Sequence, residues 1–117
     1  MKRDVAVLLT RAPYGRVHVP EGLRAARGVA AGFDRHDVTV LFTEDAVYAA
    51  RKAADRAALD MPGHIEDLLA EGGRMVADRE ALAARDVDEG EIADDVEPVS
   101  GESIARIVRD ADHTLDF

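Results

Sequence analysis

The sequence predicts an α/β layer fold with a mostly parallel sheet, because strand-like apolar runs alternate along the chain with helical patterns. The first run, 4–10, is continuous and ends at a turn, which is typical of a strand buried on both faces. Aromatic residues make up only 4% of the chain, so the core must consist of packed aliphatic side chains. The 117 residues suit a single domain, 1–117, without a linker.

The segment after the first strand predicts a loop, a helix and a second strand. A loop with Pro and Gly occupies 11–16, and a helix begins near 20–22, where Pro20 suits the first turn. Its apolar positions at helical spacing are Leu23, Ala26, Ala30 and Phe33. The β-branched run 37–42 then predicts the second strand.

The next segment predicts a helix over 43–51. Thr43 or Asp45 would cap its free N–H groups, since both carry a side-chain oxygen acceptor. The stretch 53–60 fits either a continuation of this helix or a surface excursion, and the pattern favours neither.

The following elements are shorter. A helix begins at 62–64 and ends at Gly72, because Gly tolerates the left-handed conformation of a helix end. Segment 74–77 predicts a third strand, and 79–85 predicts a short helix with Leu82 facing inward.

The C-terminal quarter predicts an acidic loop, an edge strand, a helix and a closing strand. The loop is 87–95, and 96–99 is an edge or bridging segment because proline cannot donate to a sheet ladder. Ser100 caps a helix whose apolar face is Ile104, Ile107 and Val108. The last strand is 113–117.

Three stretches of the chain, in order, resemble the DsrE/DsrF (TusD/TusC) sulfur-relay family, and most closely its DsrF/TusC branch. The first is the opening strand with the Ala-Pro-Tyr-Gly turn at 12–15 and the Glu-Gly-Leu element at 21–23. The second is 40–48, where Ala46 stands in place of the usual Gly of the branch. The third is the closing segment 111–117.

The resemblance implies a three-layer α/β/α domain with a sheet of about five strands. It also implies assembly into trimers or hexamers, either with itself or with a cysteine-bearing DsrE-like paralogue. In the family, a cysteine after an inner strand accepts sulfane sulfur as a persulfide and passes it on, in sulfur transfer that includes tRNA thiolation. Matching 81–87 to the helix of the family places that cysteine position at Asp78.

The chain contains no cysteine, and a carboxylate cannot form a persulfide. The resemblance therefore implies a structural or partner-binding subunit without a catalytic residue of its own. At Asp78, the simplest interpretation is an N-cap for the helix that follows, and the alternative is an acidic group facing a small cleft.

Polar residues follow the predicted strands, where ligands bind in parallel sheets. The loop residues Arg11, Pro13, Tyr14, Gly15 and Arg16 either form an anion- or partner-binding loop or simply fix the exit of the first strand. An alternative function is a small-ligand-binding or enzymatic domain with a polar pocket made of Asp45, Tyr48, Asp78 and Arg79.

Other functional classes find no support in the sequence. The four histidines show no paired spacing, so no metal site is predicted. The absence of a phosphate-binding glycine loop gives no reason to expect a cofactor. No run is long enough for a membrane span, and the start is unlike a signal peptide, so we expect a cytoplasmic protein.

The charge balance is strongly acidic, with 24 acidic and 15 basic residues and a net charge of -9. Such a surface repels nucleic acid and membranes, so neither is expected as a direct partner. High-GC codon usage explains part of this composition, whereas a halophilic source would also explain the acidic excess and the scarcity of lysine.

Overall fold

Five parallel strands form one sheet at the centre of the molecule. The computed structural model describes residues 2–32 and 35–117. The strands are β1 (Asp4–Leu9), β2 (Asp37–Phe42), β3 (Arg74–Asp78), β4 (Glu97–Val99) and β5 (His113–Asp116). Their order across the sheet is β4-β3-β2-β1-β5, and all pairings are parallel. The predicted α/β fold with about five strands is therefore confirmed.

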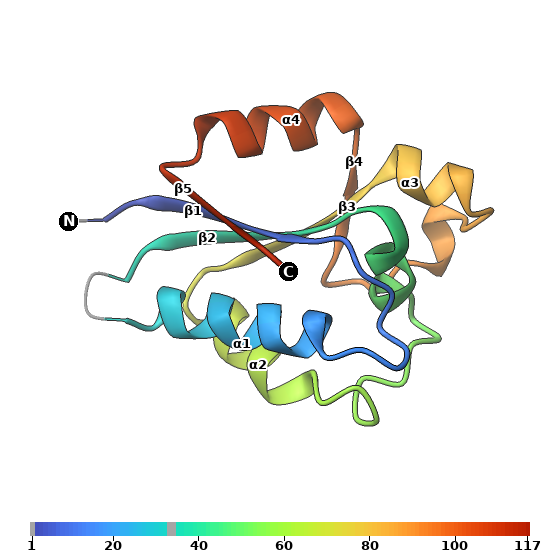
Figure 1. The fold of residues 1–117 in the computed structure, drawn as a ribbon, viewed down its shortest axis with the longest axis horizontal. Coiled ribbons are helices and arrows are strands. Elements are labelled where there is room, and N and C mark those ends of the chain that lie inside the picture. The colour runs from blue at the N-terminus through green and yellow to red at the C-terminus, as the bar shows by residue number, and fades with distance from the viewer. Residues whose placement is uncertain (1, 33–34) are drawn as a thin grey trace.

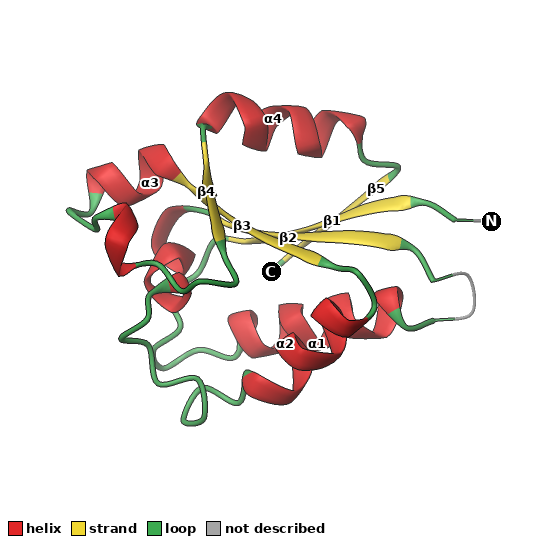
Figure 2. Cartoon of the chain, turned by 180° about the vertical axis from the view of Figure 1, so that it is seen from behind, coloured by secondary structure: helices red, strands yellow, loops and turns green. Residues whose placement is uncertain are grey.

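Helices lie on both faces of this sheet (Figures 1 and 2). The α-helices of the described residues are α1 (His18–Ala30), α2 (Pro62–Ala70), α3 (Arg79–Ala84) and α4 (Gly101–Asp110). Two short 3₁₀ helices are η1 (Glu44–Ala50) and η2 (Glu89–Glu91). Helices α1 and α2 lie side by side on one face, whereas α4 lies alone on the other.

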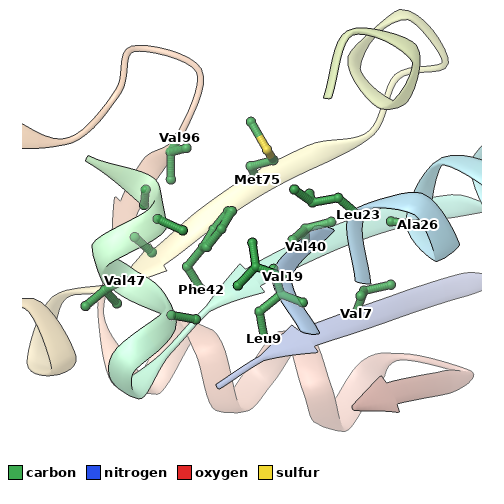
Figure 3. Packing of buried hydrophobic residues seen from close by; sticks show 14 of the residues in the cluster. Val7, Leu9, Val19, Leu23, Ala26, Val40, Phe42, Val47, Met75 and Val96 are labelled. Carbon is green, nitrogen blue, oxygen red and sulfur yellow. The ribbon is translucent and has the colours of Figure 1, made fainter. Parts of the chain in front are cut away.

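Alternation along each strand divides the core into two clusters. Val40 and Phe42 of β2 point toward α1 and η1, while Leu41 between them points toward α4. The larger cluster also contains Leu9, Leu23 and side chains from η1 (Figure 3). The smaller cluster consists of Ala6, Leu41, Val76 and Val99, with partly exposed side chains of α4 packed against it.

Gly22 explains how closely α1 approaches the sheet. A Cβ atom at this position would collide with Leu9 and lie 3.2 Å from Phe117. The Glu-Gly-Leu element singled out in the sequence is therefore a packing device, since any side chain would push α1 away from β1.

Strand positions agree with the sequence prediction, including the edge position of β4. Pro98 lies in this outermost strand, where a missing N–H does not interrupt a ladder between two neighbours. The predicted cap at Ser100 is also confirmed, because its hydroxyl oxygen accepts a hydrogen bond from the Ser103 N–H at 3.1 Å.

Several helical predictions need correction. Helix α1 begins at His18, before 20–22, because the fully buried Val19 anchors its first turn. The helix predicted over 43–51 is the 3₁₀ helix η1, and 53–60 is a turn-rich excursion. The predicted loop 87–95 contains η2. Phe33, expected on the apolar face of α1, lies outside the described residues.

Four apolar helix positions, Val29, Ile65, Leu69 and Ile107, differ in how deeply they are buried. Ile65 is buried, Val29 and Ile107 are partly buried against the two core clusters, and Leu69 is 36% exposed.

Candidate functional site

A hollow of about 620 Å³ lies where β1, β2 and β3 end, beside α4. Thr10, Thr43 and Asp78 follow or end these three strands and face the hollow together with Glu44. Its remaining wall is Leu8, Ile104, Ala105, Val108 and Arg109. Parallel strands bring their carboxyl ends to one edge of the sheet, which is why residues far apart in sequence meet here.

The two threonines of this hollow stabilise the strand ends. The Thr43 N–H and hydroxyl both donate to the Leu9 carbonyl, at 2.9 and 3.3 Å. The Thr10 hydroxyl lies 3.4 Å from the Phe117 carbonyl, to which it donates. The expected capping role of Thr43 is wrong, because its hydroxyl turns back to β1 and makes no cap hydrogen bond to η1.

Asp78 occupies the end of β3 and is partly buried. Its Oδ1 accepts a hydrogen bond from the Glu80 N–H at 3.0 Å, which confirms the predicted N-cap of α3. The same side chain lines the hollow, so the capping role and the cleft position coexist in one residue.

Glu44 adopts a backbone φ of +47°, in the left-handed region that non-glycine residues rarely occupy. This conformation turns the chain sharply from β2 into η1. Backbone conformations of this kind are common at functional sites. At Glu44 the conformation also sets the direction in which η1 begins.

The loop 11–16 projects from the end of β1 and is tied to η1. Pro13 is buried, whereas Tyr14 is 56% exposed, and Gly15 has a φ of +66° that suits glycine. Arg11 and Arg16 are exposed.

Arg51 connects this loop to η1. Its Nη2 donates to the Tyr14 hydroxyl at 2.6 Å, its Nε donates to the Tyr48 carbonyl at 2.9 Å, and its guanidinium lies 5.2 Å from the centre of the Tyr48 ring. Sequence reasoning missed Arg51, and the only local signal is its spacing of three residues from Tyr48.

The polar pocket proposed from the sequence is dispersed in the structure. Asp45 pairs with Arg85 at 3.0 Å, and Arg79 pairs with Glu89 at 3.1 Å. Of the four proposed pocket residues, only Asp78 lines the strand-end hollow. The hollow instead includes Glu44 and Arg109, which the sequence pattern did not single out.

Among residues 2–32 and 35–117, no group of three or more His, Asp or Glu side chains is placed to hold a metal ion. In the same part of the chain, no helix is long and apolar enough to cross a membrane.

A model of the DsrE/DsrF-like family matches residues 3–117, which is nearly the whole chain. The chain belongs to the DsrE/DsrF-like family. No curated protein matches the chain. Two of the solved structures that are similar to this chain match it over 100% of both chains. They are the YchN protein from E. coli, with a TM-score of 0.79 and 22% identity, and MTH1491 from Methanobacterium thermoautotrophicum, described as a protein of unknown function, with a TM-score of 0.75 and 18% identity.

These two similarities support the fold of this DsrE/DsrF-like chain. The predicted family is therefore confirmed, and so is the parallel-sheet fold that the resemblance implied. Members of the family are often oligomeric. The chain contains no cysteine.

Proposed function

We propose that this chain is a structural, partner-binding subunit of a sulfur-relay assembly and is not the sulfur carrier within it. The observation that carries the proposal is a family fold whose strand-end hollow presents a carboxylate, Asp78, in a chain without any thiol. Sulfane transfer needs a thiolate nucleophile, and no other side chain in the chain replaces it.

The hydrogen bond that the Asp78 side chain accepts at the start of α3 supports this role. One of its oxygens caps α3, so the residue contributes to local structure at the position where the family resemblance expects the sulfur-accepting group. In this proposal, helix capping has replaced sulfur chemistry at the end of β3.

The loop 11–16 supports partner binding. Tyr14 presents more than half of its surface to solvent while its hydroxyl is held by Arg51, and Arg11 and Arg16 flank it. An aromatic ring held in place loses little entropy on binding, so Tyr14 would serve as the anchor on a cysteine-bearing relative, and Arg11 and Arg16 would meet acidic side chains of that relative.

The test measures sulfur uptake and partner binding by the purified chain. We expect no thiosulfate sulfurtransferase turnover, and stable co-purification with a cysteine-bearing DsrE-like protein encoded in the same genome, weakened by Tyr14→Ala. Robust turnover by the unmodified chain alone would overturn the proposal.

A gain-of-thiol variant tests the position of Asp78. In Asp78→Cys the thiolate would attack a sulfane sulfur of inorganic polysulfide, the S–S bond of the donor would break, and a shortened polysulfide would leave. Mass spectrometry should then detect one added sulfur atom, retained longer than in the matched variant Asp94→Cys, whose position is fully in solvent. Equal loss from both variants would contradict a sheltered carrier position at residue 78.

A further inference from the structure

A second hollow, of about 440 Å³, lies at the amino ends of the strands, at the edge of the sheet opposite the strand-end hollow. Its walls include the first residues of β1, β2 and β3 and the C-terminal half of α4. Figure 1 shows the start of β1 and the end of α4 at this same edge. Proteins bind small molecules in hollows of about 300–1,000 Å³, and this one falls within that range. The sequence pattern did not predict it.

Strand alternation explains why polar and apolar side chains meet in this hollow. Asp4 and Ala6 of β1 lie on the same side of the sheet because they are two residues apart, and Ala6 belongs to the cluster under α4. Asp37 and Thr39 of β2 are their register partners and share that side. Ile107 of α4 packs against the same cluster and lines the hollow from above. A ligand would therefore meet an apolar surface with polar groups around it.

Asp4 lies between two other carboxylates. Its register partner on β2 is Asp37. On its other side, the Asp4 N–H donates to Oδ2 of Asp112 at 2.9 Å. Like charges at facing positions of neighbouring strands destabilise a sheet. Lys2 lies 3.6 Å from Asp37, but among residues 2–32 and 35–117 no cation pairs with Asp4, so a positively charged group is favoured beside it.

Arg106 supplies the opposite charge, on the α4 side of the hollow. The other arginine that lines the hollow, Arg74, pairs with Glu97 at 3.1 Å. In the part of the chain that the structure describes, Arg106 forms no ion pair, and Asp110 on the next turn contacts its neighbour in sequence, at 3.7 Å, instead. Asp4 and Arg106 thus line one hollow without pairing with each other.

We infer that this hollow binds a free α-amino acid with an apolar side chain. The ammonium group of the ligand lies beside Asp4, its carboxylate accepts hydrogen bonds from the Arg106 guanidinium, and its side chain covers Ile107 and Ala111. A purely anionic molecule would meet the carboxylates of Asp4, Asp37 and Asp110, and a purely cationic one would leave Arg106 unpaired. A zwitterion is the class of ligand that satisfies both sides of the hollow.

A titration followed by NMR tests whether the hollow binds such a ligand. The isotope-labelled chain is titrated with L-leucine and, separately, with L-phenylalanine, and the backbone amide shifts are followed. We expect saturable shifts at Ala6, Gly72 and Ala111, which line the hollow, and none at Asp78 on the opposite edge. The inference is overturned if neither amino acid gives saturable shifts around the hollow.

Analogues that lack one charge test the zwitterion. For L-leucine these are isoamylamine, without the carboxylate, and isocaproate, without the ammonium group; for L-phenylalanine they are phenethylamine and hydrocinnamate. Each analogue should bind about tenfold more weakly than its parent or worse, because one charge-assisted hydrogen bond is lost. If an amine bound as tightly as its parent amino acid, general attraction of cations to an acidic surface would account for the binding, and the inference would fail.

Charge-removing variants test the two side chains. Arg106→Gln and Asp4→Asn should each weaken binding by about tenfold or more. Both side chains are exposed, so the fold should persist, which circular dichroism checks. The matched controls Arg24→Gln, on α1 of the other face, and Asp94→Asn, which is 98% exposed, should bind as the original chain does. Equal weakening in variants and controls would assign the effect to net charge and overturn the site.

This inference is independent of the proposed function. Neither Asp4 nor Arg106 belongs to the strand-end hollow or to the loop 11–16. Failure of the amino acid to bind would leave the partner-binding role as it stands, whereas sulfur transfer by the single chain would overturn that role and leave this site intact.

Discussion

The two faces of the sheet differ in how completely they are covered. On the face of α1 and α2, strand side chains such as Leu9 and Phe42 meet helix side chains that are equally inaccessible, including Leu23 and Val19 (Figure 3). On the face of α4, buried Leu41 and Val76 of the sheet meet helix side chains that all retain exposure. The face with α1 and α2 is therefore a fully buried core, whereas the face with α4 is only partly covered.

This difference indicates which face contributes most to the stability of the single chain. Buried aliphatic contacts on the α1 side stabilise the fold of a single chain. A helix that is only half buried contributes less to the fold and leaves part of its apolar surface exposed. The contrast can be tested by truncating one side chain on each face.

The largest effect is expected on the covered face. Leu23→Ala removes a fully buried side chain between α1 and the sheet and should lower the free energy of unfolding by about 3 kcal/mol. Urea denaturation followed by circular dichroism measures it. A loss below about 1 kcal/mol would mean that α1 repacks easily and that this face is not a rigid core.

Ile107→Ala makes the corresponding change on the α4 face. Because Ile107 is partly exposed, its truncation should lower the free energy of unfolding of the single chain by only about 1–2 kcal/mol. The comparison is made at low protein concentration, so that any self-association contributes little to the measured stability. Equal losses for Leu23→Ala and Ile107→Ala would show that the two faces are equally packed.

The same contrast explains what the sequence could predict. Strands β1 and β2 are inner strands with buried side chains on both faces, so continuous apolar runs identified them to within a residue. Pro98 predicted an edge or bridging segment, because a missing donor is poorly tolerated in a central strand, and the structure places β4 at the edge of the sheet. These features depend on local pattern, and local pattern is what a single sequence reports best.

The helix after β2 could not be predicted correctly from local pattern. Ala46, Val47, Ala49 and Ala50 of η1 are all buried, so no solvent-facing stripe distinguishes an α-helix from a tighter one. Tertiary packing against β3 and α3 decides its form.

The candidate site was predicted only in part, for a related reason. Chain topology fixed its location at the strand ends, but the hydrogen-bond partners there are distant in sequence. The hydroxyl of Thr43 turns to Leu9, 34 residues earlier, and Arg51 reaches Tyr14 across 37 residues. Such partners follow from the folded arrangement, and residue type alone does not indicate them.

The smallest expected effect concerns a polar contact at the margin of the covered face. Arg56 donates two hydrogen bonds of 2.7 Å to the Asp95 carboxylate and joins the excursion 53–60 to the segment before β4. The Arg56 carbonyl accepts from the N–H of Met61, whose side chain is fully buried in the larger cluster. The ion pair therefore helps to hold a loop that supplies a core residue.

Asp95→Asn should lower the free energy of unfolding by about 1 kcal/mol at neutral pH, because a two-pronged but partly exposed pair is lost. The hydrogen bonds and charge of Arg56 hold the pKa of Asp95 below its ordinary value, so the pair stabilises the native state above the ordinary aspartate range. That contribution is lost as pH falls through the lowered pKa of the folded protein. The difference between the original chain and Asp95→Asn should consequently shrink as the pH drops below about 4.

Asp94→Asn provides the matched control, because Asp94 is 98% exposed and lies 3.8 Å from Lys52. It should change the free energy of unfolding by no more than a few tenths of a kcal/mol at any pH in the series. If Asp94→Asn and Asp95→Asn gave the same loss with the same pH dependence, the effect would reflect the removal of one negative charge from an acidic chain. If only Asp95→Asn is destabilising, and only above the aspartate range, the Arg56–Asp95 ion pair between 53–60 and the segment before β4 helps to stabilise the covered face of the sheet.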